Sequence, residues 1–304
     1  MVAHHGKSEK SEARDQREVD LEFASWHVQS RILKLSMSST VIEPSYMPVD
    51  GPATYSVTST GQVASTQEKL ALAIPTLREA ENIRSLLDHV RSVLNPLGIR
   101  YEILVVDDDS RDGTEEIVTG LARQDPRVRL LVRHGQRGLS GAILYGWQNT
   151  DASILGVMDA DLQHPPELLP RLMAGVVSGH DLVIGSRYTP GGSLSDWNPV
   201  RKLISAAAVW VTWPIQRSGL RAKDPMSGFF MVRRECLDKI PFQRAGFKLL
   251  LEILVRGRIR SVEEIPFAFG QRYRGASKAT FKVAIDYARL LARLYASRFR
   301  LRRD

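Results

Sequence analysis

Hydrophobic residues in the central part of the chain alternate between two patterns. Short, continuous apolar runs at Leu70–Pro75 and Tyr101–Val106 predict buried strands. Between them, Glu79–Leu94 carries apolar residues at helical spacing and predicts an amphipathic helix. Apolar strands separated by helices are typical of a parallel sheet that helices cover on both faces. The pattern therefore predicts an α/β domain.

The same alternation continues to Gly185 and then loosens. Further strands are expected at Val128–Val132, Ser153–Met158 and Asp181–Gly185, with helices after Gly113, over Gly138–Asn149 and after Pro166. Beyond Arg187 we expect a Gly/Pro-rich loop, then a helix at Leu203–Ile215, a strand at Gly228–Val232, a helix at Gly246–Val255 and a strand at Val262–Phe269. A last helix, Phe281–Arg300, combines one apolar stripe with several arginines.

Three regions follow from these patterns. Residues 1–66 are rich in Ser, Thr and Pro without periodicity, which predicts a mostly disordered N-terminal arm. Residues 67–278 form the α/β domain, and residues 279–304 a basic amphipathic C-terminal helix. The longest apolar stretch, Leu203–Ile215, is shorter than the roughly 20 residues that a spanning helix needs. With no secretory signal at the N-terminus, we expect a cytosolic protein.

Charge is concentrated outside the arm. Residues 67–304 hold 36 basic and 26 acidic residues, a net charge of +10, which predicts an anionic partner such as nucleic acid, an anionic membrane or a phosphorylated small molecule. Cys236 is the single cysteine, so a disulfide scaffold and a Cys-rich metal fold are excluded. Composition does not choose among the three kinds of partner.

Polar residues at the strand ends favour a small anionic ligand over nucleic acid. Asp107, Asp108 and Asp109 follow the second strand, and Arg187 follows the fifth. Ligands of open parallel sheets bind at the carboxyl ends of the strands, so these residues are expected to converge there. Carboxylates at this edge would repel a nucleic-acid backbone. Nearby Ser110, Asp112 and Thr114 are interpreted as helix-capping residues.

The fourth strand ends in a pair of carboxylates. Asp159 and Asp161 stand one residue apart and repel each other unless a cation lies between them. A hard divalent ion with oxygen ligands and bound phosphates fits that arrangement, and Gln163 would add a neutral oxygen. His164 could orient the pair or simply belong to the loop. The turn at Gly138 matches no phosphate-binding motif and indicates close helix packing or a tight helix start.

Six motifs occur in order between Ala71 and Lys278: PTLREAEN, VVDDDSRDGT, MDADLQHPPE, GSRY, DPMSGFF and RYRGASK. Together they resemble the family 2 glycosyltransferases, and specifically the polyprenyl (dolichol) phosphate mannose synthases. The resemblance implies a GT-A-like, mostly parallel open sheet flanked by helices, with residues 67–278 as the catalytic domain. It further implies inverting, metal-dependent transfer of mannose from GDP-mannose to a polyprenyl (dolichyl) phosphate at the cytosolic membrane face.

The resemblance also assigns residues. The nucleotide-sugar contacts would be Pro75, Leu77, Glu79, Val106, Asp107, Asp108, Asp159, Ala160, Asp161, Arg272 and Lys278. The metal, Mg²⁺ or Mn²⁺, would be held by Asp159, Asp161 and Gln163, and the lipid phosphate by Arg187, Arg201 and Ser205. Asp159, Asp161 and Arg187 would be the catalytic residues. A phosphate monoester is largely dianionic near neutral pH, so the acceptor needs no general base.

The acceptor lipid requires contact with a membrane surface. Trp210 and Trp213 suit a membrane interface, although an ordinary buried helix fits their pattern equally well. The apolar stripe of Phe281–Arg300 and its arginines favour a membrane-interface helix over a helix packed on the domain. We therefore expect a peripheral protein on the cytosolic face, with a membrane-protein subunit left open as a further partner.

Three alternatives remain at this stage. Another sugar, such as glucose from UDP-glucose, could be transferred, because Leu77 replaces the aromatic residue usual in the first motif. The chain could instead be a non-catalytic, basic nucleic-acid-binding protein, or a membrane-bound scaffold that binds nucleotide sugar without turnover. The strand-end carboxylates argue against nucleic acid, and the intact Asp159, Asp161, Arg272 and Lys278 argue against a scaffold.

Overall fold

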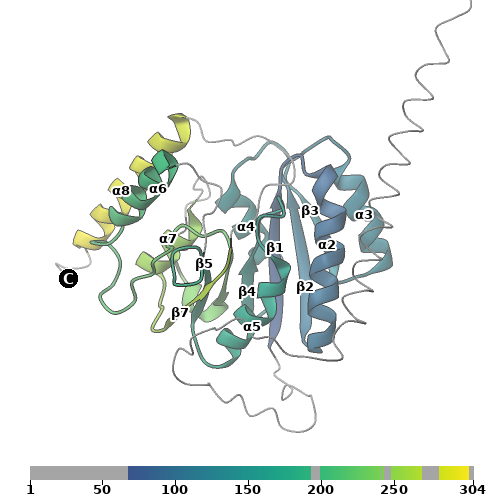
Figure 1. Ribbon diagram of the computed structural model, residues 1–304. Helices are drawn as coiled ribbons and strands as arrows, with labels where there is room; N and C mark the ends of the chain where they lie inside the picture. The colour runs from purple at the N-terminus through teal and green to yellow at the C-terminus, as the bar shows by residue number, and fades with distance from the viewer. Residues whose placement is uncertain (1–67, 193–198, 241, 243–247, 269–280, 301–304) are drawn as a thin grey trace, which may run out of the picture. The chain divides into compact units, whose positions relative to one another are not determined.

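The fold is that of a computed structural model (Figure 1), which describes residues 68–192, 199–240, 242, 248–268 and 281–300. At 199–202, 204, 281–284 and 299–300 it describes the backbone alone. The predicted N-terminal arm, together with Arg272 and Lys278, lies outside the described residues. The described residues all belong to one compact unit.

A seven-stranded sheet forms the centre of this unit, with the order β3-β2-β1-β4-β6-β5-β7. Strand pairs β1–β2, β2–β3, β1–β4 and β5–β7 are parallel. The bounds are β1 Lys69–Thr76, β2 Arg100–Asp107, β3 Val128–Val132, β4 Ile154–Val157, β5 Leu182–Ser186, β6 Phe230–Arg233 and β7 Val262–Pro266. The predicted mostly parallel α/β fold is confirmed, and Pro266, which cannot donate to a ladder, ends the edge strand β7.

Strand β6 is the exception to the parallel pattern. It runs antiparallel to both neighbours, with Phe230 opposite Val157 of β4 and opposite Ile184 of β5. Because β6 is antiparallel, its first residues lie at the edge where β4 and β5 end. The segment before β6, which includes Ser227 and Gly228, is thereby brought to the ligand edge of the sheet.

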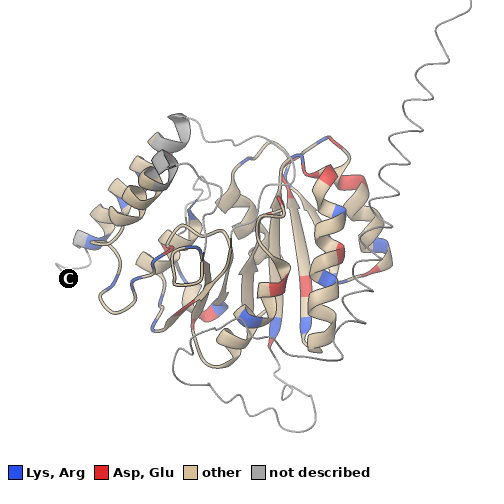
Figure 2. Ribbon diagram, in the orientation of Figure 1, with Lys and Arg blue, Asp and Glu red and all other residues tan. Residues whose placement is uncertain are grey.

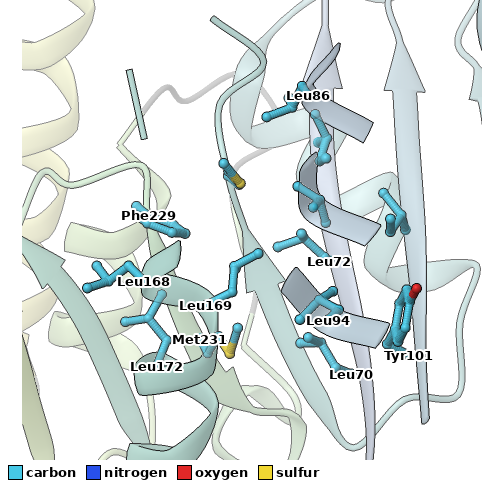
Figure 3. Close-up of a cluster of buried hydrophobic side chains, with 14 of the residues drawn as sticks. Leu70, Leu72, Leu86, Leu94, Tyr101, Leu168, Leu169, Leu172, Phe229 and Met231 are labelled. Carbon is cyan, nitrogen blue, oxygen red and sulfur yellow. The ribbon is translucent and has the colours of Figure 1, made fainter. Parts of the chain in front are cut away.

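Helices cover both faces of the sheet, which explains why β1 is buried along nearly its whole length. One face is covered by α2 (Ala80–Leu94), α3 (Thr114–Gln124) and α5 (Leu169–Val177), and the other by α4 (Leu139–Gln148) and α7 (Leu249–Arg256). Figure 3 shows part of the first layer, where Leu70 and Leu72 of β1 lie among Leu86, Leu94 and Leu169. Three short 3₁₀ helices among the described residues adjoin these elements, at Asn95–Leu97 after α2, Pro166–Leu168 before α5 and Arg234–Leu237 after β6.

Two further helices extend beyond the sheet layers (Figure 1): α6 (Pro199–Trp210) and α8 (Phe281–Arg300). Leu290 and Leu294 of α8 are buried against α7 and Ile215. The Tyr287 hydroxyl donates to the Ala208 carbonyl oxygen at 2.6 Å, which ties α8 to α6. The two buried leucines lie outside the apolar stripe that the sequence predicted. Of that stripe, Leu291 and Tyr295 pack partly against the domain, whereas Ile285, Ala288 and Ala292 are exposed. The membrane-interface role of this helix stays a prediction.

Helix α6 differs from its predicted bounds: it begins at Pro199 and ends at Trp210, and a turn replaces its last residues. In that turn the Thr212 hydroxyl donates to the Val209 carbonyl oxygen at 2.6 Å. Trp210 and Trp213 are 73% and 43% exposed, so the helix is not an ordinary buried core element. Among the described helices, none is long and apolar enough to cross a membrane.

Candidate active site

The ends of β1 and β2 form one flank of the site. Figure 2 shows acidic residues gathered at this upper edge of the sheet. Asp107 is buried, and its carboxylate accepts hydrogen bonds from the Thr76 hydroxyl at 2.8 Å and the Ser110 backbone N–H at 2.8 Å. This carboxylate therefore holds the ends of β1 and β2 together.

Asp108 is also engaged within the chain. Its carboxylate accepts from Arg133 Nε at 2.7 Å and from the Gly138 backbone N–H at 2.9 Å. Gly138 has φ of 135°, a conformation that favours glycine, and directly precedes α4. The predicted tight helix start is confirmed, and Asp108 fixes that start against β2. The nucleotide contacts expected of Asp107 and Asp108 stay predictions.

The loop after β1 contains the remaining residues of the first motif. Pro75 and Val106 are buried partners in the β1–β2 register. Glu79 directly precedes α2, and its carboxylate accepts from the Asn82 side-chain amide at 2.9 Å. Leu77, next to the left-handed Arg78, is half-buried in the same loop.

For Asp112 the capping interpretation of the neighbouring loop is confirmed. The Asp112 carboxylate accepts from the backbone N–H groups of Ala80 and Thr114, both at 3.1 Å. One carboxylate therefore caps the starts of α2 and α3 together. Ser110 accepts from the backbone N–H of Arg78 at 2.8 Å, so it also belongs to the scaffold of this loop.

The acidic pair follows β4, as predicted. Ala160 and Asp161 are buried, and the Gln163 backbone N–H donates to an Asp161 carboxylate oxygen at 3.3 Å. Leu162 between them has φ of 61°, a conformation that non-glycine residues rarely adopt. This left-handed residue turns the chain so that Gln163 stays beside Asp161. The metal role of Asp159, Asp161 and Gln163 stays a prediction.

Asp159 lines a cavity, and its carboxylate lies close to Gly228. A Cβ added at Gly228 would lie 2.8 Å from Asp159 Oδ2, so any residue other than glycine would displace this carboxylate. Burial raises the pKa of Asp159, and the nearby charge of Asp161 adds to the shift. Both effects are relieved by a cation, which fits the chemistry of a divalent-metal site.

His164 supports this loop from behind. Its ring is buried and stacks on Phe229 with a centroid distance of 5.0 Å, and Nδ1 accepts the Asp159 backbone N–H at 3.2 Å. Burial lowers the pKa of His164, which keeps the imidazole neutral and Nδ1 available as an acceptor. Of the two interpretations considered above, orientation of the acidic pair is the one that these contacts favour.

Arg187 follows β5 and faces the same cavity. Its Nε and Nη2 donate to the two carboxylate oxygens of Asp224, each at 2.8 Å, and its backbone N–H donates to Asp224 at 3.0 Å. Burial opposes the charged form, but the hydrogen bonds and charge of Asp224 outweigh it and raise the pKa of Arg187. Asp224 belongs to the DPMSG motif, yet its pairing with Arg187 could not be seen in the sequence.

The lipid-phosphate residues are partly described. The Ser205 hydroxyl lies 2.7 Å from the hydroxyl of Tyr188, the residue after Arg187, which places this part of α6 near the end of β5. Arg201 stands one helical turn before Ser205 and its side chain is not described. Arg272 and Lys278, assigned to the diphosphate, lie outside the described residues.

Lys248 is a site residue that the sequence did not reveal. It precedes α7 and lines a cavity of about 100 Å³ together with Asp159, Arg187 and Gly228. Burial, reinforced by the charge of Arg187, lowers the pKa of Lys248, and Asp159 and Asp224 oppose this shift. A lysine at the start of an apolar helix has the pattern of a solvent-facing end, so sequence alone gave no signal.

The donor set at β4 fits a hard divalent cation. Two carboxylates and an amide supply only oxygen ligands, and phosphate oxygens and water would complete the shell of Mg²⁺ or Mn²⁺. Within the described ranges no group of three or more His, Cys, Asp or Glu residues is placed to hold a metal ion. The expected protein ligands are two carboxylates and one amide, Asp159, Asp161 and Gln163, and this assignment stays a prediction.

An open, mostly parallel sheet with carboxylates and cations at its carboxyl edge defines an α/β transferase of the GT-A type. The chain belongs to glycosyltransferase family 2: the sequence model described as Glycosyl transferase family 2 matches residues 71–243. It is therefore a glycosyltransferase, as the six motifs predicted.

Curated relatives refine this assignment. The chain is 42% identical over 226 residues to a dolichol-phosphate mannosyltransferase from Pyrococcus furiosus, a match that covers 74% of this chain and 63% of that protein. It is 37% identical to the dolichol-phosphate mannosyltransferase of Saccharomyces cerevisiae, with 75% and 88% covered. A third protein of that name, from Mycosarcoma maydis, is 36% identical with 79% and 84% covered. The chain thus groups with the dolichol-phosphate mannosyltransferases.

Solved structures confirm the fold. Mannosyl-3-phosphoglycerate synthase from Rubrobacter xylanophilus superposes with a TM-score of 0.57 at 18% identity, covering 77% of this chain and 75% of that one. Glucosyl-3-phosphoglycerate synthase from Mycobacterium tuberculosis, crystallised with Mn²⁺, UDP and product, gives a TM-score of 0.54 at 20% identity, with 76% and 80% covered.

Proposed function

We propose that the protein transfers mannose from GDP-mannose to a polyprenyl (dolichyl) phosphate, with inversion at the anomeric carbon. The observation on which this rests is that Asp159, after β4, and Arg187, after β5, line one cavity. A carboxylate suited to a metal-bound diphosphate and a guanidinium suited to a phosphate acceptor thus meet at one place. The names of the curated relatives support mannose and a dolichyl acceptor.

In this reaction a phosphate oxygen of the acceptor attacks the anomeric carbon of mannose, and the bond from that carbon to the β-phosphate oxygen of GDP breaks. The acceptor dianion is already deprotonated near neutral pH, so no protein base is required. The neutral, buried state of His164 agrees with a supporting role. Arg187, held in orientation by Asp224, would position the acceptor phosphate.

Asp159, Asp161 and Gln163 would hold Mg²⁺ or Mn²⁺. When bound, the ion neutralises charge that develops on the departing diphosphate. Crystals of a structural neighbour with Mn²⁺ are compatible with this assignment. Arg272 and Lys278 would add positive charge around the diphosphate. The nucleotide sugar would also contact Pro75, Leu77, Glu79, Val106, Asp107, Asp108 and Ala160. The bonds that Asp107 and Asp108 make within the chain would hold this loop in shape.

The acceptor chain would enter from a membrane to which the protein binds peripherally, on the cytosolic face. Leu203, Trp210, Val211 and Trp213 are exposed apolar residues of α6 and the turn that follows it. Large exposed apolar patches mark interaction sites, and tryptophan is favoured at membrane interfaces. Ser205, on the same helix, lies within hydrogen-bond distance of Tyr188, the residue after Arg187. The helix therefore connects these exposed residues to the neighbourhood of Arg187. A membrane-protein subunit would be an additional partner.

The test is transfer of radiolabelled mannose from GDP-mannose to a short polyprenyl phosphate, run with Mg²⁺, with chelator, and with Asp161→Ala. We expect a lipid-linked product that is lost in both controls and restored when Mg²⁺ or Mn²⁺ is returned to the chelated enzyme. Product from UDP-glucose alone would retain the mechanism and overturn the donor. No product with any donor, or salt-dependent binding to nucleic acid that sugar nucleotides leave unchanged, would contradict the enzyme proposal.

A further inference from the structure

A second partly buried cation, Lys248, shares the cavity with Arg187 although it lies 61 positions further along the chain. The cavity is bounded by the end of β4, the residues after β5, the Ser227–Gly228 segment before β6 and the start of α7. The Lys248 ammonium lies 3.4 Å from the Met226 carbonyl oxygen. Protein thus surrounds this charge on several sides.

The position of the cavity along the sheet edge indicates which part of the donor reaches it. In the sheet order, β2 and β1 come first, then β4 with its acidic pair, then β6 and β5. If the nucleotide binds at β1 and β2 and the diphosphate at Asp159 and Asp161, the next group along this line is the sugar. The cavity lies at that next position, between β4, β6 and β5.

The size and lining of the cavity fit a monosaccharide. The cavity has a volume of about 100 Å³ and is partly open, so it can admit the sugar of a nucleotide sugar while the rest of the donor lies outside it. Apolar side chains, among them Leu139, Met226 and Leu249, form about half of the wall, and polar or charged groups form the other half. Small-ligand sites are typically apolar with a few placed polar groups that fix orientation. Those polar groups would form hydrogen bonds with the hydroxyls of a sugar.

We propose that Lys248 donates hydrogen bonds to hydroxyl groups of the transferred sugar and so contributes to the choice of donor sugar. This inference rests on the proposed function for the position of the nucleotide. A lysine has three donors on a compact head, which suits neighbouring hydroxyl oxygens. Arg187 donates through Nε and Nη2 to Asp224, which orients its guanidinium, and we assign it to the acceptor phosphate rather than to the sugar.

The experiment compares GDP-mannose with GDP, each titrated calorimetrically with Mg²⁺ into the wild type, Lys248→Met and Lys239→Met. Lys239 is an exposed lysine near the opposite end of β6, so it controls for the loss of one positive charge. We expect Lys248→Met to bind GDP-mannose about 10- to 100-fold more weakly, the effect of losing a hydrogen bond from a charged group. GDP binding should weaken by less than about two-fold, because GDP would lose only a long-range attraction between its diphosphate and the Lys248 charge.

Each other outcome has a distinct meaning. Equal weakening of GDP and GDP-mannose would make Lys248 a diphosphate contact and overturn the inference, as would unchanged binding of both. If the wild type binds UDP-glucose and UDP but not the guanosine ligands, the proposed donor fails. The same comparison with UDP-glucose and UDP then decides the role of Lys248. Wild-type protein that binds no nucleotide sugar would overturn both proposals.

Discussion

Arg187 and Asp224 form a bidentate ion pair, with Nε–Oδ2 and Nη2–Oδ1 distances both 2.8 Å, across 37 positions of sequence. Asp224 is fully buried, and its own backbone N–H donates to Glu264 of β7 at 3.0 Å. The pair therefore connects the end of β5 to the DPMSG segment and to the edge strand. It fixes the direction in which the Arg187 guanidinium faces the cavity.

We predict that Asp224→Asn lowers both stability and transfer. Removal of one partner leaves the Arg187 charge buried without its counter-charge, which typically costs about 3 to 5 kcal/mol. Denaturant unfolding should show that loss, and mannosyl transfer measured where the variant remains folded should fall at least about ten-fold. Asp238→Asn, a change at an exposed carboxylate, is the control. A stable and fully active Asp224→Asn variant would show that Arg187 needs no such clamp.

Gly228→Ala should weaken the metal site with little effect on the fold. The new Cβ would meet Asp159 Oδ2 at 2.8 Å, and the flexible carboxylate would move aside rather than the backbone. We expect the Mn²⁺ concentration for half-maximal activity to rise about ten-fold or more, a change of about 1.4 kcal/mol.

The matched control for that substitution is Gly120→Ala. Gly120 lies in α3, and a Cβ there would meet no atom within 4 Å. Alanine in a helix interior is favoured over glycine by roughly 0.5–1 kcal/mol, so this variant should be slightly more stable with an unchanged Mn²⁺ requirement. An unchanged Mn²⁺ requirement in Gly228→Ala as well would remove Asp159 from the metal site.

Asp125 should make stability depend on pH in the acid range. Hydrogen bonds from Arg127 lower its pKa from 3.8 to about 2, against the opposing effect of burial. A carboxyl whose pKa is lower in the folded state stabilises the fold above its unfolded pKa, and this contribution is lost as the pH falls toward 2. Asp125→Asn should therefore cost about 1–2 kcal/mol near pH 7, a value reduced for screening because Arg127 is 42% exposed.

The measurement is urea unfolding of the wild type and Asp125→Asn between pH 7 and the lowest pH at which both fold. The difference in the free energy of unfolding should remain constant down to about pH 5 and then shrink below about pH 4. A difference that stays the same at all pH values would mean that the lost contribution is packing rather than charge.

Membrane binding should depend on the exposed tryptophans. Trp210→Ser and Trp213→Ser should each weaken binding to vesicles containing anionic lipid by roughly ten-fold, because burial of a large apolar side chain contributes about 1.5 kcal/mol or more. Flotation with vesicles measures this, and thermal unfolding should be nearly unchanged. Tyr145→Ser, at an exposed aromatic residue of α4, should bind vesicles like the wild type. Equal binding by all variants would place the membrane contact elsewhere.

Local periodicity predicted the elements well because it reflects burial directly. Strand β3 and helix α8 have the predicted bounds, and β1, β2, β4 and β5 differ from theirs by one or two residues. The start of α6 was missed, because Pro199 and the residues after it include two basic side chains that interrupt the apolar pattern. Its end was also missed, because a turn containing the buried Thr212 is as apolar as the helix.

The sequence by itself determined the α/β alternation and the family, and it predicted that Asp159, Asp161 and Gln163 lie together, because these depend on periodicity and on residues a few positions apart. The tertiary structure decided the direction of β6, the engagement of Asp108 by Arg133 and Gly138, and the pairing of Arg187 with Asp224. It also brought Lys248 to Asp159 and Arg187. The physical reason is that these contacts join positions remote in sequence, and strand order and direction bring such positions together without leaving a mark on local hydrophobic pattern.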